Sequence, residues 1–434
     1  MKDLGIGLFL LALLMATPAV AQNNEAQAKS GAASRKIAWP NHLALGRQLE
    51  SKGDFAEAEK EYLAAVNEAE RQGEPALLRC LNYLAVFYGH ARKFAACEQV
   101  SQRMLDIAER LYGPEDPATA TALNNLTQLR QAQDQPGDHD VIFRRVLAIR
   151  ERAFGPDSVE VADVLQNLAG FYRSRGQYSE AERLFRRCLA ILEKTVEPEH
   201  PRLALALSDL ALVYYTQGLY AKAEPLLVRA LAMREKTLPS EHPELATTLN
   251  NLASVYAHRG SYAEAESLHR RALAIKERAL GPDHPDVAAA LNNLAELYRA
   301  QGRFGDAEPL YRQALAIWER SAGTSHAGTA ATLGNLAELY RQQGRYGEAE
   351  PLFQRALAIK QKGALAGEDI TVAGLLARYA ALLRETKRKG EAAKLEARAR
   401  GIVKSLGGSD YARFTIDIQA LAKDRTAYSL LDPQ

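Results

Sequence analysis

The sequence predicts an all-α protein, a superhelical solenoid of about nine antiparallel helix pairs. The first observation is a repeat: residues 291–320 read LNNLAELYRAQGRFGDAEPLYRQALAIWER, and residues 333–362, 42 positions later, read LGNLAELYRQQGRYGEAEPLFQRALAIKQK. The second is that apolar residues in each copy follow helical spacing. A fixed period of about 20 to 50 residues is typical of solenoids, in which each unit buries its apolar face against its neighbours.

Residues 1–21, MKDLGIGLFLLALLMATPAVA, predict a cleavable signal peptide. Lys2 precedes an apolar run from Leu4 to Ala16, and Ala19–Val20–Ala21 has the small-x-small order of a cleavage site. The run is shorter than the roughly 20 residues that span a bilayer. We therefore expect cleavage after Ala21 and a periplasmic or secreted protein, with no transmembrane segment in the mature chain. A retained anchor is the alternative, because Asp3 cancels the charge of Lys2.

The polar residues 22–41 predict a flexible linker, and the repeats occupy residues 42–404. Residues 405–434 lie outside the period and form a C-terminal extension. Within it, residues 411–423 are a possible capping helix over the exposed end of the stack.

Each unit predicts two helices. The break between them carries a glycine where the first helix ends, as in AQGRF at 300–304, and the break between units reads GPDHPD at 281–286, where Pro285 suits the first turn of the next helix. Short breaks make successive helices antiparallel neighbours. The first helices are expected to start near His42, Ala76, Pro117, Val159, Pro201, Pro243, Pro285, Ala327 and Thr371.

Prolines disturb this pattern in two ways. Pro136 stands where the other units carry Tyr or Phe, so the second helix of the third unit is expected to begin late. Pro225, Pro309 and Pro351 fall early in their second helices. Small residues four positions earlier favour a kinked but continuous first turn there.

The spacing of Leu294, Ala295, Tyr298, Ala307, Tyr311 and Ala314 resembles the tetratricopeptide repeat. The longer unit of 42 residues, with its LNNLA, RALAIxE and GPDHP segments, is similar to the repeats of kinesin light chains and their bacterial relatives. This resemblance implies that Ala295 and Ala307 meet where the paired helices approach most closely. HEAT repeats, the alternative, lack this alanine spacing and the Gly-x-Tyr turn.

An amide series is the main candidate site. Asn125, Asn167, Asn251, Asn293 and Asn335 recur at 42 residues, with Asp209 in the same register. The resemblance implies that they line a concave groove and hold the main chain of an extended peptide, since an amide both donates and accepts hydrogen bonds. The alternative is that they brace neighbouring helices. Asn292 and the basic residues Arg173, Arg299 and Arg341 are expected near the same groove, where the arginines are either carboxylate ligands or solvated helix ends.

Other features argue against further chemistry. The 55 basic and 53 acidic residues leave a net charge of +2, which argues against a nucleic-acid partner. No catalytic motif is present, so we expect neither an enzyme nor a cofactor. His200, His242, His284 and His326 are interpreted as turn residues rather than metal ligands, and Cys97 and Cys188 as small core residues without a disulfide. Residues 384–404 have a basic excess that fits a charged end-cap, an acidic partner or phospholipid headgroups.

The sequence therefore predicts an exported scaffold that binds an extended segment of a partner protein in a concave groove. The alternative is a structural solenoid that self-associates, or an accessory subunit of an envelope complex.

Overall fold

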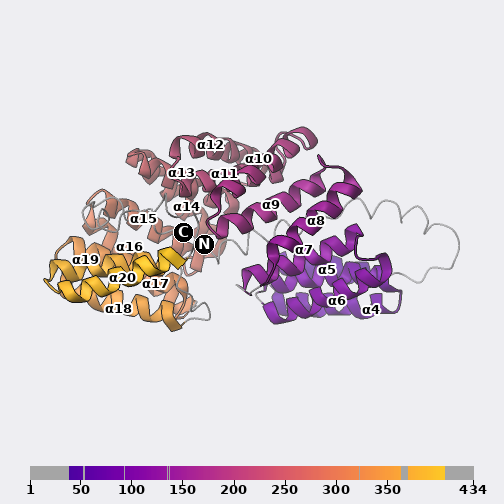
Figure 1. Ribbon diagram of the computed structural model, residues 1–434, viewed down its shortest axis with the longest axis horizontal. Helices are drawn as coiled ribbons and strands as arrows, with labels where there is room; N and C mark the ends of the chain where they lie inside the picture. Colours follow the sequence, from indigo (N-terminus) through magenta and orange to yellow (C-terminus); the bar gives the residue numbers. More distant parts are fainter. Residues whose placement is uncertain are drawn as a thin grey trace. The chain divides into compact units, whose positions relative to one another are not determined.

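The computed structural model describes residues 39–405, apart from residues 52, 53, 92, 134, 136, 322 and 363–369. In this part the chain forms eighteen helices and no strand, which confirms an all-α solenoid of nine helix pairs (Figure 1). The first and second helices of the pairs are α3 (Trp39–Ser51) and α4 (Phe55–Glu70), α5 (Glu74–His90) and α6 (Phe94–Tyr112), α7 (Pro117–Ala132) and α8 (His139–Phe154), α9 (Val159–Ser174) and α10 (Tyr178–Thr195), α11 (Pro201–Thr216) and α12 (Tyr220–Thr237), α13 (Pro243–His258) and α14 (Tyr262–Leu280), α15 (Pro285–Ala300) and α16 (Phe304–Ser321), α17 (Ala327–Gln342) and α18 (Tyr346–Lys362), and α19 (Ile370–Glu385) and α20 (Lys389–Ser405).

The predicted signal peptide and C-terminal capping helix lie outside the described residues. One boundary was wrong: α3 begins at Trp39, so the last three residues of the predicted linker are helical. Two features explain the earlier start. Pro40 suits the first turn of a helix, and the indole Nε1 of Trp39 donates to Oε1 of Gln72 at 3.0 Å, which ties this end to the turn between α4 and α5.

The described chain divides into two compact units. Unit 1 runs to Phe171 and includes Arg183–Val196, which covers most of α10 and the residue after it. Unit 2 comprises Tyr172–Glu182 and all helices from α11 onward. The last five helix pairs therefore belong to unit 2.

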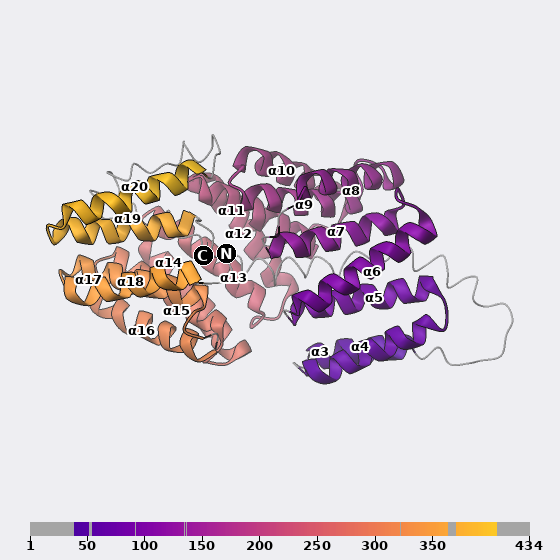
Figure 2. The ribbon, with the colours of Figure 1, turned by 60° about the horizontal axis from the view of Figure 1, so that its bottom comes forward.

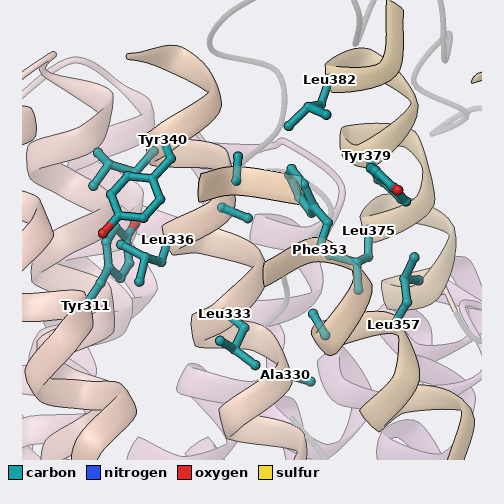
Figure 3. Packing of buried hydrophobic residues seen from close by; sticks show 14 of the residues in the cluster. Tyr311, Ala330, Leu333, Leu336, Tyr340, Phe353, Leu357, Leu375, Tyr379 and Leu382 are labelled. Carbon is teal, nitrogen blue, oxygen red and sulfur yellow. The ribbon is translucent and has the colours of Figure 1, made fainter. Parts of the chain in front are cut away.

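Small residues allow close packing within each helix pair. Ala295 of α15 and Ala307 of α16 are both completely buried in one cluster, as predicted, together with their counterparts Ala337 and Ala349 in the next pair. Aromatic side chains fill the space between pairs: Phe353 of α18 stacks on Tyr379 of α19 with ring centroids 5.8 Å apart (Figure 3). Overpacking such contacts costs about 1 to 3 kcal/mol, so the alanines fix the approach of the two helices.

Histidines begin four consecutive first helices in unit 2. Nδ1 of each ring accepts the backbone N–H two residues later at 3.1–3.3 Å, which satisfies one of the free donors at a helix start. The four N-caps are His200, His242, His284 and His326. The sequence placed these residues correctly in turns, but their capping role emerges only from the structure.

The remaining local predictions concern prolines and cysteines. Helix α8 begins late, at His139, and α12, α16 and α18 run unbroken through their internal prolines, as expected. The three cysteines are buried and do not form disulfides, and Sγ of Cys97 contacts the carbonyl oxygen of Ala85 at 3.2 Å. In the ninth repeat, Lys387 stands at the position of the turn glycine. Its own φ is 64°, in the positive range that the glycines adopt in the other repeats.

Candidate protein-binding face

Three asparagines of the series brace neighbouring first helices. Nδ2 of Asn125 donates to Oδ1 of Asn82 at 3.0 Å, and Nδ2 of Asn167 donates to Oδ1 of Asn124 at 3.2 Å. Nδ2 of Asn335 donates to Oδ1 of Asn292 at 3.3 Å. Each bond joins residues 43 apart, one repeat plus one position. These amides are nearly buried and already engaged within the protein.

Asn251 and Asn293 differ from the other members of the series. Both side chains are partly exposed, and neither side-chain amide forms a hydrogen bond among the residues that the structure describes. Oδ1 of Asn293 is buried without a hydrogen-bond partner. These two amides lie at equivalent positions of the adjacent helices α13 and α15.

The residues at the positions of their bracing partners form hydrogen bonds elsewhere. The residue 43 positions before Asn251 is Ser208, whose hydroxyl donates to the Ala204 carbonyl at 2.8 Å. The residue 43 positions before Asn293 is Asn250, whose Oδ1 lies 2.9 Å from Nδ1 of the buried His269. The sixth member of the series, Asp209, carries a carboxylate and lies 4.0 Å from a guanidinium nitrogen of Arg173.

Two of the three predicted arginines, Arg299 and Arg341, pair with a carboxylate of their own helix, and Arg341 also pairs with Glu385 of α19. Nε of Arg299 donates to Oε2 of Glu296 at 2.9 Å, and Arg341 holds Glu338 through two hydrogen bonds of 2.9 and 2.7 Å. Both guanidinium groups are nearly buried. The bidentate geometry at Glu338 is a strong form of charge-assisted hydrogen bond. A partner carboxylate would have to compete with these pairs.

Glu296 is held in its charged form. Burial acts to raise the pKa of this carboxyl, but the charge and hydrogen bonds of Arg299, together with a 2.8 Å hydrogen bond from Tyr311, lower its pKa to about 2. Its charge also acts on His258 of α13. Glu296 and Arg299, which lie on the same helix as Asn293, therefore form a fixed pair of opposite charges.

The sequence analysis missed Arg378 of α19. Its Nη1 donates to Oδ1 of Asn335 at 2.9 Å, so it extends the bracing chain of Asn292 and Asn335. The signal was present but shifted: the spacing between the starts of α17 and α19 is 43 rather than 42 residues, which places Arg378 at the asparagine position of the ninth repeat.

Family models establish what these repeats are. A tetratricopeptide-repeat model matches residues 76–138, 142–194, 160–236, 244–319 and 286–362, and a second tetratricopeptide-repeat model matches residues 119–160. The chain belongs to the tetratricopeptide-repeat family. Proteins of this family generally act as protein-interaction scaffolds rather than as enzymes.

Two solved structures are similar in sequence to part of this tetratricopeptide-repeat protein. A Podosopora anserina protein described as a kinesin light chain with nearly identical TPR-like repeats is 33% identical, over 46% of this chain and 93% of that chain, with a TM-score of 0.40. BtubC (BKLC) from P. vanneervenii is 26% identical, over 54% and 92%, with a TM-score of 0.41.

The apo quorum sensor NprR from B. thuringiensis is 15% identical over 82% of this chain and 98% of that chain, with a TM-score of 0.58, a likeness of fold alone. A search of curated proteins found no match. No helix in the described ranges is both long and apolar enough to cross a membrane.

Proposed function

We propose that this tetratricopeptide-repeat protein is a non-enzymatic scaffold that holds an extended segment of a partner protein against the first helices of unit 2. The observation that carries the proposal is the difference between the two uncommitted amides, Asn251 and Asn293, and their braced counterparts. Because neither side chain is bonded within the described residues, the Asn251 amide and the Nδ2 group of Asn293 can hydrogen-bond to a peptide main chain without breaking an internal bond. The partner's side chains would then lie near the Glu296 carboxylate, which is already paired with the nearly buried Arg299.

The test uses peptides selected from a random display library against the whole protein, followed by calorimetric titration. Replacing Asn251 and Asn293 together by Ala removes hydrogen bonds with a net value of about 0.5 to 1.5 kcal/mol each. We expect affinity to fall about tenfold, with little change in melting temperature because no internal bond is lost.

Asn125→Ala with Asn167→Ala is the matched control, since those amides brace neighbouring helices. This control should lower the melting temperature and leave affinity unchanged below it. If the two double variants exchange these outcomes, or if Asn251 and Asn293 prove irrelevant to peptide affinity, the proposed site is wrong.

We further propose that the protein is exported, as residues 1–21 suggest. N-terminal sequencing of the cell-envelope or secreted form should give Gln22, whereas an intact Met1 on a cytosolic protein would contradict export. The self-assembling alternative predicts a mass that rises with concentration in analytical ultracentrifugation. The groove-binding scaffold requires no such association.

A further inference from the structure

In the described part of unit 2, outward-facing cations of several second helices are paired with acids of the preceding repeat. Arg271 bonds Glu235 at 2.6 Å, and Arg278 bonds Glu241 at 3.0 Å. The same arrangement recurs one and two repeats later, where Arg320 meets Asp283 and Arg355 meets Glu319. These pairs leave the second helices of unit 2 with little local excess of either charge.

The final helix, α20, departs from this pattern. Lys389, Lys394, Arg400 and Lys404 are exposed and form no ion pair or hydrogen bond within residues 39–405 as described. The acids of the helix are already engaged by other arginines. Arg388 holds Glu391 through bonds of 2.7 and 2.6 Å, and Arg384 holds Glu396 through bonds of 2.5 and 2.8 Å. Lys394 and Arg400 therefore lie near carboxylates that are already neutralised.

The four cations share one side of the helix. At 3.6 residues per turn they fall within an arc of about 140° and extend along about 22 Å of helix. Every other residue in this arc is an exposed Gly or Ala: Gly390, Ala393, Ala397 and Gly401. The opposite side, with Ala392, Ala399 and Ile402, is completely buried. It packs with α19, which lies beside α20 in both views (Figures 1 and 2). We call the outward arc the basic face of α20.

The composition of the basic face distinguishes between possible partners. Protein–protein interfaces take most of their binding energy from buried aromatic and large apolar side chains, and the basic face has no apolar side chain larger than alanine. Attraction to a planar anionic surface requires only charge, and it grows with each Lys or Arg that reaches the surface together. Short neighbouring side chains let all four cations reach one plane.

We propose that the basic face of α20 binds the surface of an anionic membrane, at the level of the lipid headgroups and without insertion. This proposal is independent of the peptide site, because it uses none of the residues around Asn251 and Asn293. The solenoid would then be held at a membrane through its last repeat while the first helices of unit 2 remain available to a partner.

The test is sedimentation of the full mature protein with vesicles of phosphatidylcholine alone, or of phosphatidylcholine and phosphatidylglycerol in equal parts. We expect binding only to the anionic vesicles, and its loss at about 1 M salt, where charges are screened within a few ångströms. The variant K389Q/K394Q/R400Q/K404Q should weaken binding to the anionic vesicles by at least about tenfold.

The matched control K236Q/R271Q/R278Q/R320Q removes the same charge from second helices of unit 2 and should bind nearly as the wild type. A single variant, A397E, places an anion at the centre of the basic face and should also weaken binding while circular dichroism remains unchanged. Equal binding to neutral vesicles, or equal loss in the control, would overturn the proposal. Binding to soluble poly-L-glutamate as tight as to the anionic vesicles would also overturn it and assign the face to an acidic polypeptide.

Discussion

At the residue scale, two positions change together along the repeats. In two repeats of unit 2 a cation at the end of the second helix faces an acid in the next first helix: Nε of Arg234 lies 3.4 Å from Oε2 of Glu244, and the charge of Asp286 acts on the buried Lys276. One repeat later the corresponding residues are Trp318 and Gly328. A Cβ atom at Gly328 would lie 2.5 Å from the indole of Trp318. The large ring therefore leaves no room for a side chain at position 328.

Gly328→Asp should therefore lower the free energy of unfolding by about 1 to 3 kcal/mol, because the new side chain overlaps Trp318. Adding Trp318→Lys recreates the cation–acid pair of the preceding repeats and should recover most of the loss. Urea unfolding of the two variants and the wild type measures both steps. A double variant no more stable than Gly328→Asp would show that the pair is not interchangeable between repeats.

The limits of sequence inference are also clearest at this scale. The 42-residue period identified every asparagine of the series, but it could not separate the braced from the uncommitted members. That difference depends on whether Ser208 and Asn250 are bonded elsewhere, and Asn250 is taken by His269, a residue 19 positions away on another helix. Spacing along one helix carries no information about such a contact.

At the element scale, a recurring clasp of Tyr, Glu and Arg joins successive pairs. In the eighth repeat, the hydroxyl of Tyr340 donates to Glu308 of the preceding second helix at 3.0 Å. Arg345, from the turn after α17, bonds the other oxygen of Glu308 at 2.8 Å and lies 3.9 Å from the centroid of the Tyr340 ring. Tyr298, Glu266 and Arg303 form the same clasp one repeat earlier. A clasp ties three segments that the alanine contacts alone do not join.

Tyr340→Phe keeps the ring but removes the hydroxyl bond to Glu308 and the 2.9 Å bond from Arg312. We expect a loss of about 0.5 to 1.5 kcal/mol in the free energy of unfolding. Tyr346→Phe in α18 is the matched control, because no hydrogen bond of its hydroxyl is found among the described residues, and it should be nearly neutral. Urea unfolding of Tyr340→Phe, Tyr346→Phe and the wild type measures the difference. If Tyr340→Phe is as stable as the other two, the hydroxyl bonds of the clasp add nothing to the packing of the ring.

Most of the helices could be predicted because their signals are local. The glycines and prolines between helices predicted the starts of the first helices to within three residues. Pro136 correctly predicted the late start of α8. The clasps, the histidine caps and Arg378 were missed. The clasps and Arg378 depend on partners in another repeat, and the caps on the orientation of a ring within a turn.

At the scale of the whole molecule, a net charge near zero hides local differences in surface charge. The net charge of +2 agrees with the paired charges on the second helices. It gives no indication of the basic face of α20, whose four cations are not paired with described acids of the preceding repeat. A linear array makes this possible, since charges at one end interact little with charges several repeats away, beyond the screening length of about 8 to 10 Å. Average composition is therefore a poor guide to the surfaces of a solenoid.

Acidity should destabilise unit 2 through its histidines. Burial lowers the pKa of His269 to about 4, and burial also lowers the pKa values of His258 and His200. His258 is stacked on Tyr220 and bonded to the hydroxyl of Tyr215, and His200 accepts a backbone N–H as an N-cap. Since these groups bind protons more readily in the unfolded chain, where the pKa is about 6.5, stability is full above that pH and declines below it.

We therefore expect the melting temperature to fall between about pH 6.5 and 4.5. His269 alone should contribute a loss of about 2 kcal/mol at about pH 5, because one pKa unit corresponds to about 1.4 kcal/mol. Between these two pH values, the loss of stability comes from the histidines. Carboxylates with lowered pKa values, such as Glu296 at about 2, lose their contribution to stability only as the pH falls below about 4.5. His269→Gln keeps a donor for Asn250 but cannot titrate, so the difference in stability between about pH 7.5 and 5 should shrink by most of that amount, whatever the variant's stability at neutral pH. Thermal melts across this range measure the difference, and a variant with the wild-type pH dependence would exclude His269 as its source.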